Sequence, residues 1–80
     1  MSTVSAPTTP LGNLIRLARL DNAWSQAHLG AGVGVAQSIV SAWENGKTRP
    51  SAAHILKLAD VLEVDRAALW DALAVEEAGR

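Results

Sequence analysis

Apolar residues recur every three or four positions along most of the chain, the spacing that places them on one face of an α-helix. The pattern predicts a first helix over residues 10–21 and two shorter ones over about 26–32 and 36–45. Two further helices follow Ser51 and Asp65. Their apolar stripes consist of Ile55, Leu58, Ala59 and Leu62, and of Leu69, Trp70 and Leu73. No segment alternates with period two over a strand's length. The sequence therefore predicts an all-α fold, a bundle of five short helices.

Polar and small residues mark where these helices begin and end. Residues that can cap a helix N-terminus through a side-chain oxygen precede four of the helices, namely Thr9, Ser25, Ser51 and Asp65. Pro10 suits the first helical position. After the third helix, Gly46 suits a left-handed backbone, and Pro50 prevents the helix from continuing.

Length and composition restrict the classes of protein to be considered. Eighty residues form one small domain. We place it at residues 10–77, after a polar segment over residues 1–9 that we interpret as a disordered tail. The chain has no cysteine, which excludes disulfides and thiolate metal sites. Its apolar runs are far shorter than the roughly 18 residues that span a bilayer, and its N-terminus lacks a secretory pattern. We therefore expect a cytoplasmic protein, with no membrane and no metal among its partners.

Residues 26–45 match the requirements of a helix-turn-helix, in which two helices cross at close range. Five positions of this window must be apolar, and they are Leu29, Val33, Val35, Val40 and Trp43. The fifth position must be small, because the helices cross there, and it is Gly30. The ninth must accept a left-handed backbone, where a Cβ is costly, and it is Gly34. So many matches in one window disfavour an ordinary helical hairpin.

The segment SQAHLGAGVGVAQSIVSAWENGKTRPS, with the later ILKLADVLEV, resembles the lambda-repressor/Cro (XRE-type) family of DNA-binding domains. The resemblance covers about residues 11–73. It includes the Ser-Gln opening of the second helix, the Trp-Glu-x-Gly close of the third and the Leu-Ala-x-x-Leu of the fourth. It implies a five-helix bundle that binds double-stranded operator DNA, usually as a dimer, and acts as a transcriptional repressor at the nucleoid.

The third predicted helix is similar in detail to the recognition helix of the lambda repressor. The resemblance implies that Gln37, Ser38 and Ala42 contact bases. It also implies that Gln26 braces Gln37 and touches a phosphate. The chemistry agrees, because glutamine can pair with adenine through two hydrogen bonds, serine can bond a purine, and an alanine methyl can pack on a thymine methyl. Ser41 lies on the same side of the helix and joins the predicted base-reading set.

Candidate phosphate contacts lie mostly just beyond this helix, where the duplex backbone would pass. The set consists of Asn45, Lys47, Thr48 and Arg49, together with Arg16 from the first helix. Residues 1–50 hold four basic and two acidic residues, whereas residues 51–80 hold three and six. We therefore expect any anion-binding surface in the first two thirds of the chain. A net charge of −1 is unusual for a protein that binds nucleic acid.

Arg19 and Glu44 occupy positions at which the family often forms a partly buried ion pair between the first and third helices. The resemblance therefore implies a structural pair, and two solvated charges are the alternative. The acidic run Glu76-Glu77 is interpreted as a solvated helix end.

One apolar surface remains beyond what the bundle requires, at the end of the last helix, and it consists of Trp70, Leu73 and Val75. We expect a homodimer through this end. The sparse positive charge, Ile39 and the acidic C-terminal half keep a second function open, that of a protein-interaction module such as an antitoxin or adaptor. No nucleophile–base pair or carboxylate dyad is evident, so we expect neither enzymatic activity nor a cofactor.

Overall fold

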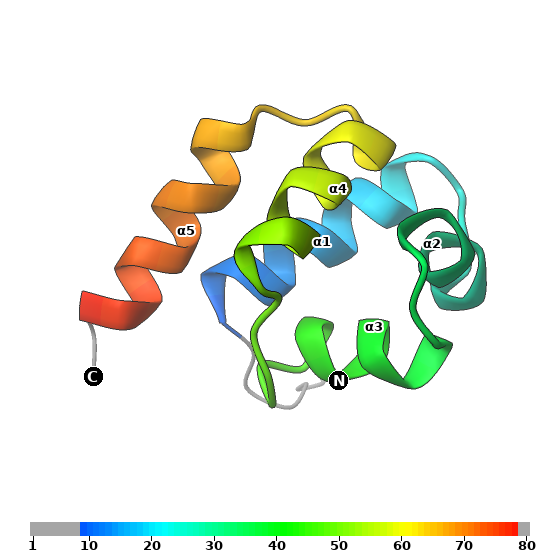
Figure 1. The fold of residues 1–80 in the computed structure, drawn as a ribbon, viewed down its shortest axis with the longest axis horizontal. Coiled ribbons are helices and arrows are strands. Elements are labelled where there is room, and N and C mark those ends of the chain that lie inside the picture. The colour runs from blue at the N-terminus through cyan, green and yellow to red at the C-terminus, as the bar shows by residue number, and fades with distance from the viewer. Residues whose placement is uncertain (1–8, 79–80) are drawn as a thin grey trace, which may run out of the picture.

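The computed structural model describes residues 9–78, and this part of the chain consists of five α-helices and no strand (Figure 1). The helices are α1 (Pro10–Asp21), α2 (Gln26–Val33), α3 (Gln37–Glu44), α4 (Ala52–Leu62) and α5 (Arg66–Ala78). The predicted all-α bundle of five helices is therefore confirmed. None of these helices has both the length and the apolar character needed to span a membrane.

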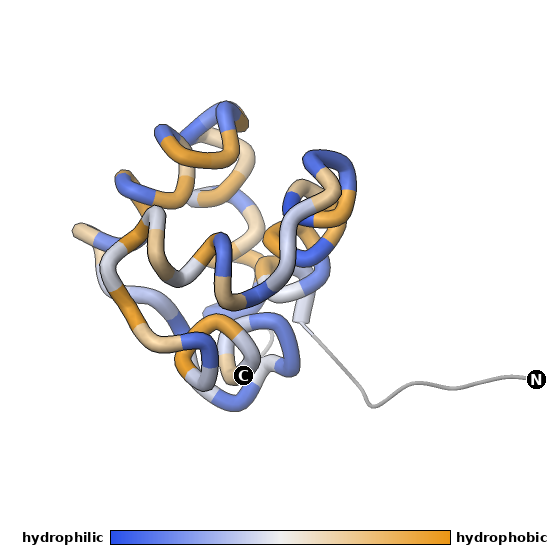
Figure 2. Tube along the Cα trace, turned by 90° about the vertical axis from the view of Figure 1, so that its right-hand side faces the viewer, coloured by the Kyte–Doolittle hydropathy of each residue, from blue (hydrophilic) through white to orange (hydrophobic). Residues whose placement is uncertain are grey.

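The five helices share one apolar core. Its buried residues are Leu11, Ile15, Leu29, Val33, Val40, Trp43, Ile55, Leu58, Ala59, Leu62 and Leu69. α1 packs against α3, α4 and α5, and α2 packs against α3 and α4 (Figure 1). Hydrophobic and hydrophilic residues alternate in short runs along the helical trace (Figure 2), because each helix turns one face inward.

The helix starts use the predicted capping residues. The hydroxyls of Thr9, Ser25 and Ser51 accept hydrogen bonds from first-turn N–H groups at 3.0, 3.0 and 3.2 Å. The carboxylate of Asp65 does the same at the start of α5, at 3.1 Å. α3 differs, because its N-cap is Ala36, which offers no side-chain acceptor. Thr9, which the predicted tail includes, is thus part of the folded domain, and residues 1–8 lie outside the described residues.

The two glycines predicted to be left-handed adopt that conformation, with φ of 91° at Gly34 and 75° at Gly46. Gly34 is the C-cap of α2, so this helix includes Val33 and ends one residue later than predicted. Gly46 also lies against the chain entering α1. A Cβ there would come within 2.8 Å of the methyl carbon of Thr9. The backbone angle therefore favours glycine at both positions, and the lack of space for a Cβ favours it at Gly46 as well.

The interpretation of Glu76 as part of a solvated helix end is wrong. This residue is 9% exposed, and its Oε2 accepts the N–H of Leu11 at 2.7 Å. That N–H belongs to the first turn of α1 and has no partner within its own helix. A carboxylate is also favoured at the positive end of a helix dipole. The end of α5 is therefore fastened to the start of α1, while the neighbouring Glu77 stays exposed.

Candidate nucleic-acid interface

The turn between α2 and α3 brings the two helices into close contact at Gly30. A Cβ on this residue would lie 2.6 Å from the carbonyl oxygen of Val35, closer than real Cβ contacts come. The carbonyl of Gly30 also accepts the N–H groups of Gly34 and Val35, at 2.7 and 2.9 Å. The small residue and the left-handed turn predicted from the sequence therefore set the crossing of α2 and α3.

α3 has a buried face and an exposed face. Val40 and Trp43 are buried in the core. Gln37 and Ser38 are exposed at the start of the helix, as is Ile39. The two other predicted base-reading residues, Ser41 and Ala42, are half-buried. The exposed surface at the first turn of α3 thus presents two polar side chains and one apolar side chain.

A chain of hydrogen bonds links this surface to the interior. Gln37 Nε2 donates to Gln26 Oε1 at 3.3 Å, and Gln26 Nε2 donates to Glu44 Oε1 at 3.1 Å. Arg19 then donates to both oxygens of Glu44, from Nε at 2.7 Å and from Nη2 at 3.0 Å. The third guanidinium nitrogen donates to the carbonyl of Trp24 at 2.8 Å. The bracing of Gln37 by Gln26, which the resemblance implied, is present in the structure.

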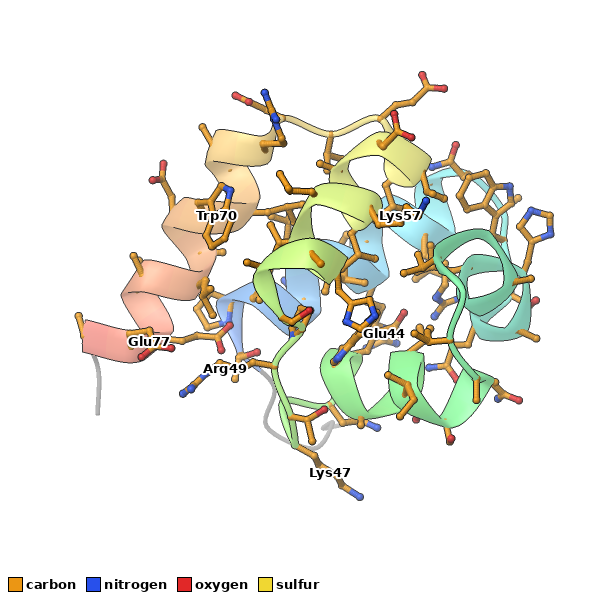
Figure 3. The ribbon with its side chains drawn as sticks, viewed as in Figure 1. Glu44, Lys47, Arg49, Lys57, Trp70 and Glu77 are labelled. Carbon is orange, nitrogen blue, oxygen red and sulfur yellow. The ribbon has the colours of Figure 1, made fainter. Side chains whose placement is uncertain are left out.

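The Arg19–Glu44 pair is buried rather than solvated. Arg19 is 9% exposed and Glu44 3%, and Glu44 points from α3 toward the interior (Figure 3). Hydrogen bonding and charge attraction from Glu44 raise the pKa of Arg19 above its ordinary value, against the lowering effect of burial. The guanidinium therefore stays charged, and its fork geometry matches the carboxylate through two parallel bonds. The pair links α1 to α3, and its carboxylate also accepts the hydrogen bond from Gln26.

The loop after α3 carries the predicted phosphate contacts in two different settings. Lys47 and Thr48 are exposed, and Lys47 points away from the body of the molecule (Figure 3). The backbone N–H of Lys47 bonds the carbonyl of Ala42 at 2.9 Å, which fixes the loop against the helix end. Asn45 is exposed and donates to Ser41 Oγ at 3.3 Å. Asn45, Lys47 and Thr48 therefore lie together at the C-terminal end of α3.

Arg49, also predicted to contact a phosphate, is ion-paired within the molecule. Its Nε lies 3.4 Å from Glu76 Oε1, and its Nη1 lies 3.3 Å from Glu77 Oε2. The loop therefore directs this cation toward α5, where two carboxylates meet it. Arg16 is exposed on α1, and no ion pair of this residue occurs within residues 9–78.

The apolar residues predicted for a dimer contact do not form one surface. Trp70 and Val75 are exposed, but five residues of helix separate them by about 140° around the α5 axis. Leu73 is half-buried and packs against the core. Trp70 instead faces the viewer in Figure 3, one helical turn after Arg66, which lines a surface depression between α4 and α5.

Two features of the site were missed from the sequence. The contact between Gln26 and Glu44 had a local signal, because the resemblance already placed both residues beside Gln37 and Arg19. The contacts of Glu76 with Leu11 and Arg49 had none, since they join residues 65 and 27 positions apart. The sequence around a glutamate near the end of a helix does not show whether its side chain is solvated or buried.

Solved structures similar to this chain include three regulators. The P22 c2 repressor, in complex with a synthetic operator, is 34% identical with a TM-score of 0.71, over 74% of this chain and 89% of that one. The restriction-modification controller protein C.AhdI from Aeromonas hydrophila is 31% identical with a TM-score of 0.72, over 76% and 92%. The biofilm regulator SinR, in complex with DNA, is 31% identical with a TM-score of 0.69, over 75% and 97%.

The helix-turn-helix family model matches residues 15–69, most of the described chain. No curated protein gives a significant match to the sequence. The matched range contains the α2–α3 turn, the Arg19–Glu44 pair and the loop that follows α3. The resemblance drawn from the sequence is confirmed, and the chain belongs to the helix-turn-helix family of the lambda-repressor/Cro type.

Proposed function

We propose that the protein binds double-stranded DNA in a sequence-specific manner and regulates transcription as a repressor, with α3 in the major groove. The observation that carries the proposal is the exposed start of α3, where Gln37 is linked through Gln26 to the buried Arg19–Glu44 pair. The major groove admits an α-helix. A side chain that is already held in place loses less conformational freedom on binding than a free one does.

The exposed groups at α3 suit base edges. Gln37 can pair with the N6 and N7 atoms of adenine, and Ser38 can bond a purine. Ile39, exposed beside them, offers an apolar surface to a thymine methyl. Because Ser41 and Ala42 are half-buried, we expect them to contact only the bases that lie closest to α3. The base preference therefore rests chiefly on the first turn of α3.

Phosphate contacts come from few cations. Lys47 beside the end of α3 and Arg16 on α1 are exposed and available. Thr48, Asn45 and Gln26 add neutral donors, which position a protein on the duplex backbone without adding charge. So small a number of charged contacts gives one subunit modest affinity and a shallow salt dependence.

The similar structures support this reading. The P22 c2 repressor was solved with a synthetic operator and SinR with DNA, and this chain is 34% and 31% identical to them. Each alignment covers about three quarters of this chain and nearly all of the regulator domain compared. A cytoplasmic regulator acting on the chromosome follows from the same proposal.

Selection of bound duplexes from random DNA tests the function and supplies the target site. On the selected site, Gln37→Ala should weaken binding by about 1–3 kcal/mol and remove the preference at one A·T pair. Lys47→Ala should instead weaken all sequences alike and flatten the slope of log K against log salt by about 0.9. Lys57, an exposed lysine on α4, supplies the matched control Lys57→Ala, which should change neither (Figure 3).

Random DNA from which no sequence is enriched would contradict the proposal. So would a Gln37→Ala variant with the affinity and base preference of the wild type. Binding of a protein partner that is insensitive to salt, without binding to DNA, would favour the interaction-module alternative instead.

We propose further that two copies act together, because one α3 reads only a few base pairs. The contact surface follows the depression of about 430 Å³ between α4 and α5, which is lined by Leu56, Ala59, Asp60, Val64, Asp65 and Arg66. Leu56 and Trp70 are 45% and 38% exposed, and Trp70 lies one helical turn after Arg66 on α5. The surface carries both charge signs, so that a carboxylate of one copy can meet the arginine of the other in a self-complementary two-fold contact. Val75 lies on another side of α5 and is left out.

Trp70→Glu should therefore convert the dimer to a monomer and weaken binding to an inverted repeat with half-sites about 34 Å apart. Val75→Glu introduces the same charge on the other side of α5 and should leave assembly unchanged. Sedimentation with and without the duplex measures both. Equal effects of the two variants, or a single copy on the full site, would exclude the α4–α5 surface as the contact.

A further inference from the structure

We infer that Glu76 and Glu77 hold Arg49 away from the duplex, so that the end of α5 limits how strongly the loop after α3 binds DNA phosphates. The inference rests on the proposed DNA binding and adds an internal competitor to it. Arg49 is in the loop whose other cation, Lys47, is free in solvent.

The geometry places Arg49 between two carboxylates. Nε lies 3.4 Å from Glu76 Oε1, and Nη1 lies 3.3 Å from Glu77 Oε2. The side chain of Arg49 is 28% exposed, whereas Lys47, two residues earlier, points outward (Figure 3). The two cations of one loop therefore face different partners, and only Lys47 is turned away from the protein.

The charge balance of this cluster opposes DNA. Two carboxylates against one guanidinium leave one negative charge beside a loop that would face phosphates. Like charges brought close together cost free energy, least when they are exposed to solvent. Glu76 cannot turn away, because its other oxygen is bonded to the N–H of Leu11 at the start of α1. The carboxylate of Glu76 is therefore held in its ion pair with Arg49.

The guanidinium is not fully bonded in this position. Nη2 of Arg49 is buried and has no hydrogen-bond partner among the described residues. A buried donor without an acceptor lowers the stability of the arrangement that contains it. A phosphate accepts two parallel bonds from a guanidinium. Arg49 can therefore exchange its two carboxylate partners for a phosphate when its contacts with Glu76 and Glu77 are weakened.

Glu77→Gln tests this exchange, because Glu77 is mostly exposed and plays no part in capping α1. The probe is a labelled duplex of about 20 base pairs and arbitrary sequence, titrated over a range of salt, so that phosphate contacts dominate. Glu77→Gln should tighten binding about twofold to fivefold, the size of an exposed ion pair. The slope of log K against log salt should steepen by up to about 0.9 as one more phosphate is neutralised.

The same substitution in an Arg49→Ala background should have no effect, because the released cation is then missing. Arg49→Ala alone should weaken binding no more than Lys57→Ala, a loss of the same charge from an exposed site on α4. Asp71→Asn, which removes an exposed acid from α5 outside the cluster, gives the effect of net charge alone. Glu76→Gln is a second variant, since its amide oxygen can still accept the N–H of Leu11.

Tighter binding that persists in the Arg49→Ala background, or that Asp71→Asn reproduces, would overturn the inference. An Arg49→Ala protein weakened as much as Lys47→Ala would also overturn it, because Arg49 would then already bind DNA. In both cases the wild type binds DNA and the proposed function stands. If neither the wild type nor Glu77→Gln binds the duplex at low salt, the proposed function fails, and the inference fails with it.

Discussion

Replacing Glu44 with alanine should lower the free energy of unfolding by about 3–5 kcal/mol, because it leaves a buried guanidinium without its carboxylate. Arg19 would keep only its bond to the carbonyl of Trp24, and Gln26 would lose its acceptor in Glu44 as well. For a domain of this size the melting temperature should fall by at least about 12 °C. Urea unfolding followed by circular dichroism measures the change.

Glu63→Ala is the matched control, because Glu63 is exposed, forms no ion pair within the described residues, and has a left-handed backbone (φ 57°) that is as strained for alanine as for glutamate. It should change the unfolding free energy by less than about 0.5 kcal/mol. The double variant Arg19→Met with Glu44→Leu should regain most of the loss, since an apolar pair removes both desolvated charges. Equal midpoints for Glu44→Ala and Glu63→Ala would show that the pair is not buried in solution.

Glu76→Ala should be the second most damaging of these substitutions, with a loss of about 2–3 kcal/mol. It removes the acceptor of the Leu11 N–H and leaves Arg49 with only the exposed Glu77. Hydrogen exchange of the Leu11 amide should accelerate more than that of core amides, because the first turn of α1 would open separately.

Glu77→Ala, one residue along and exposed, should cost less than about 1 kcal/mol, as surface ion pairs do. Glu76→Gln should fall between the two, since it keeps an acceptor but loses the charge. If Glu76→Ala and Glu77→Ala were equally stable, the end of α5 would not be docked on α1 as the structure has it.

Local physical chemistry accounts for how much of this fold could be predicted from sequence. Caps at Thr9, Ser25 and Ser51 act on N–H groups three positions away, so the residue type alone predicts a helix start. The left-handed turns at Gly34 and Gly46 are local in the same sense. All of these predictions agree with the structure.

The rest depends on contacts between distant segments. Glu76 meets Leu11 and Arg49 only because α5 returns along α1, and no local pattern separates that glutamate from Glu77. The same packing places Arg49, predicted to contact a phosphate, beside two carboxylates of α5. The docking angle of α5, rather than its own sequence, also determines which of its sides is exposed. Trp70 lies on that exposed side.

The central claim is that the α3 side of the molecule binds DNA, and amide chemical-shift mapping with a selected duplex tests it most directly. The account predicts the largest shifts at Gln26, over residues 36–42 and over residues 45–48, with smaller ones at Arg16. Amides lining the α4–α5 depression, such as those of Leu56 and Asp60, should move only as far as dimerisation requires. Shifts concentrated on α4 and α5, with Gln37 and Ser38 unmoved at saturating duplex, would contradict the account.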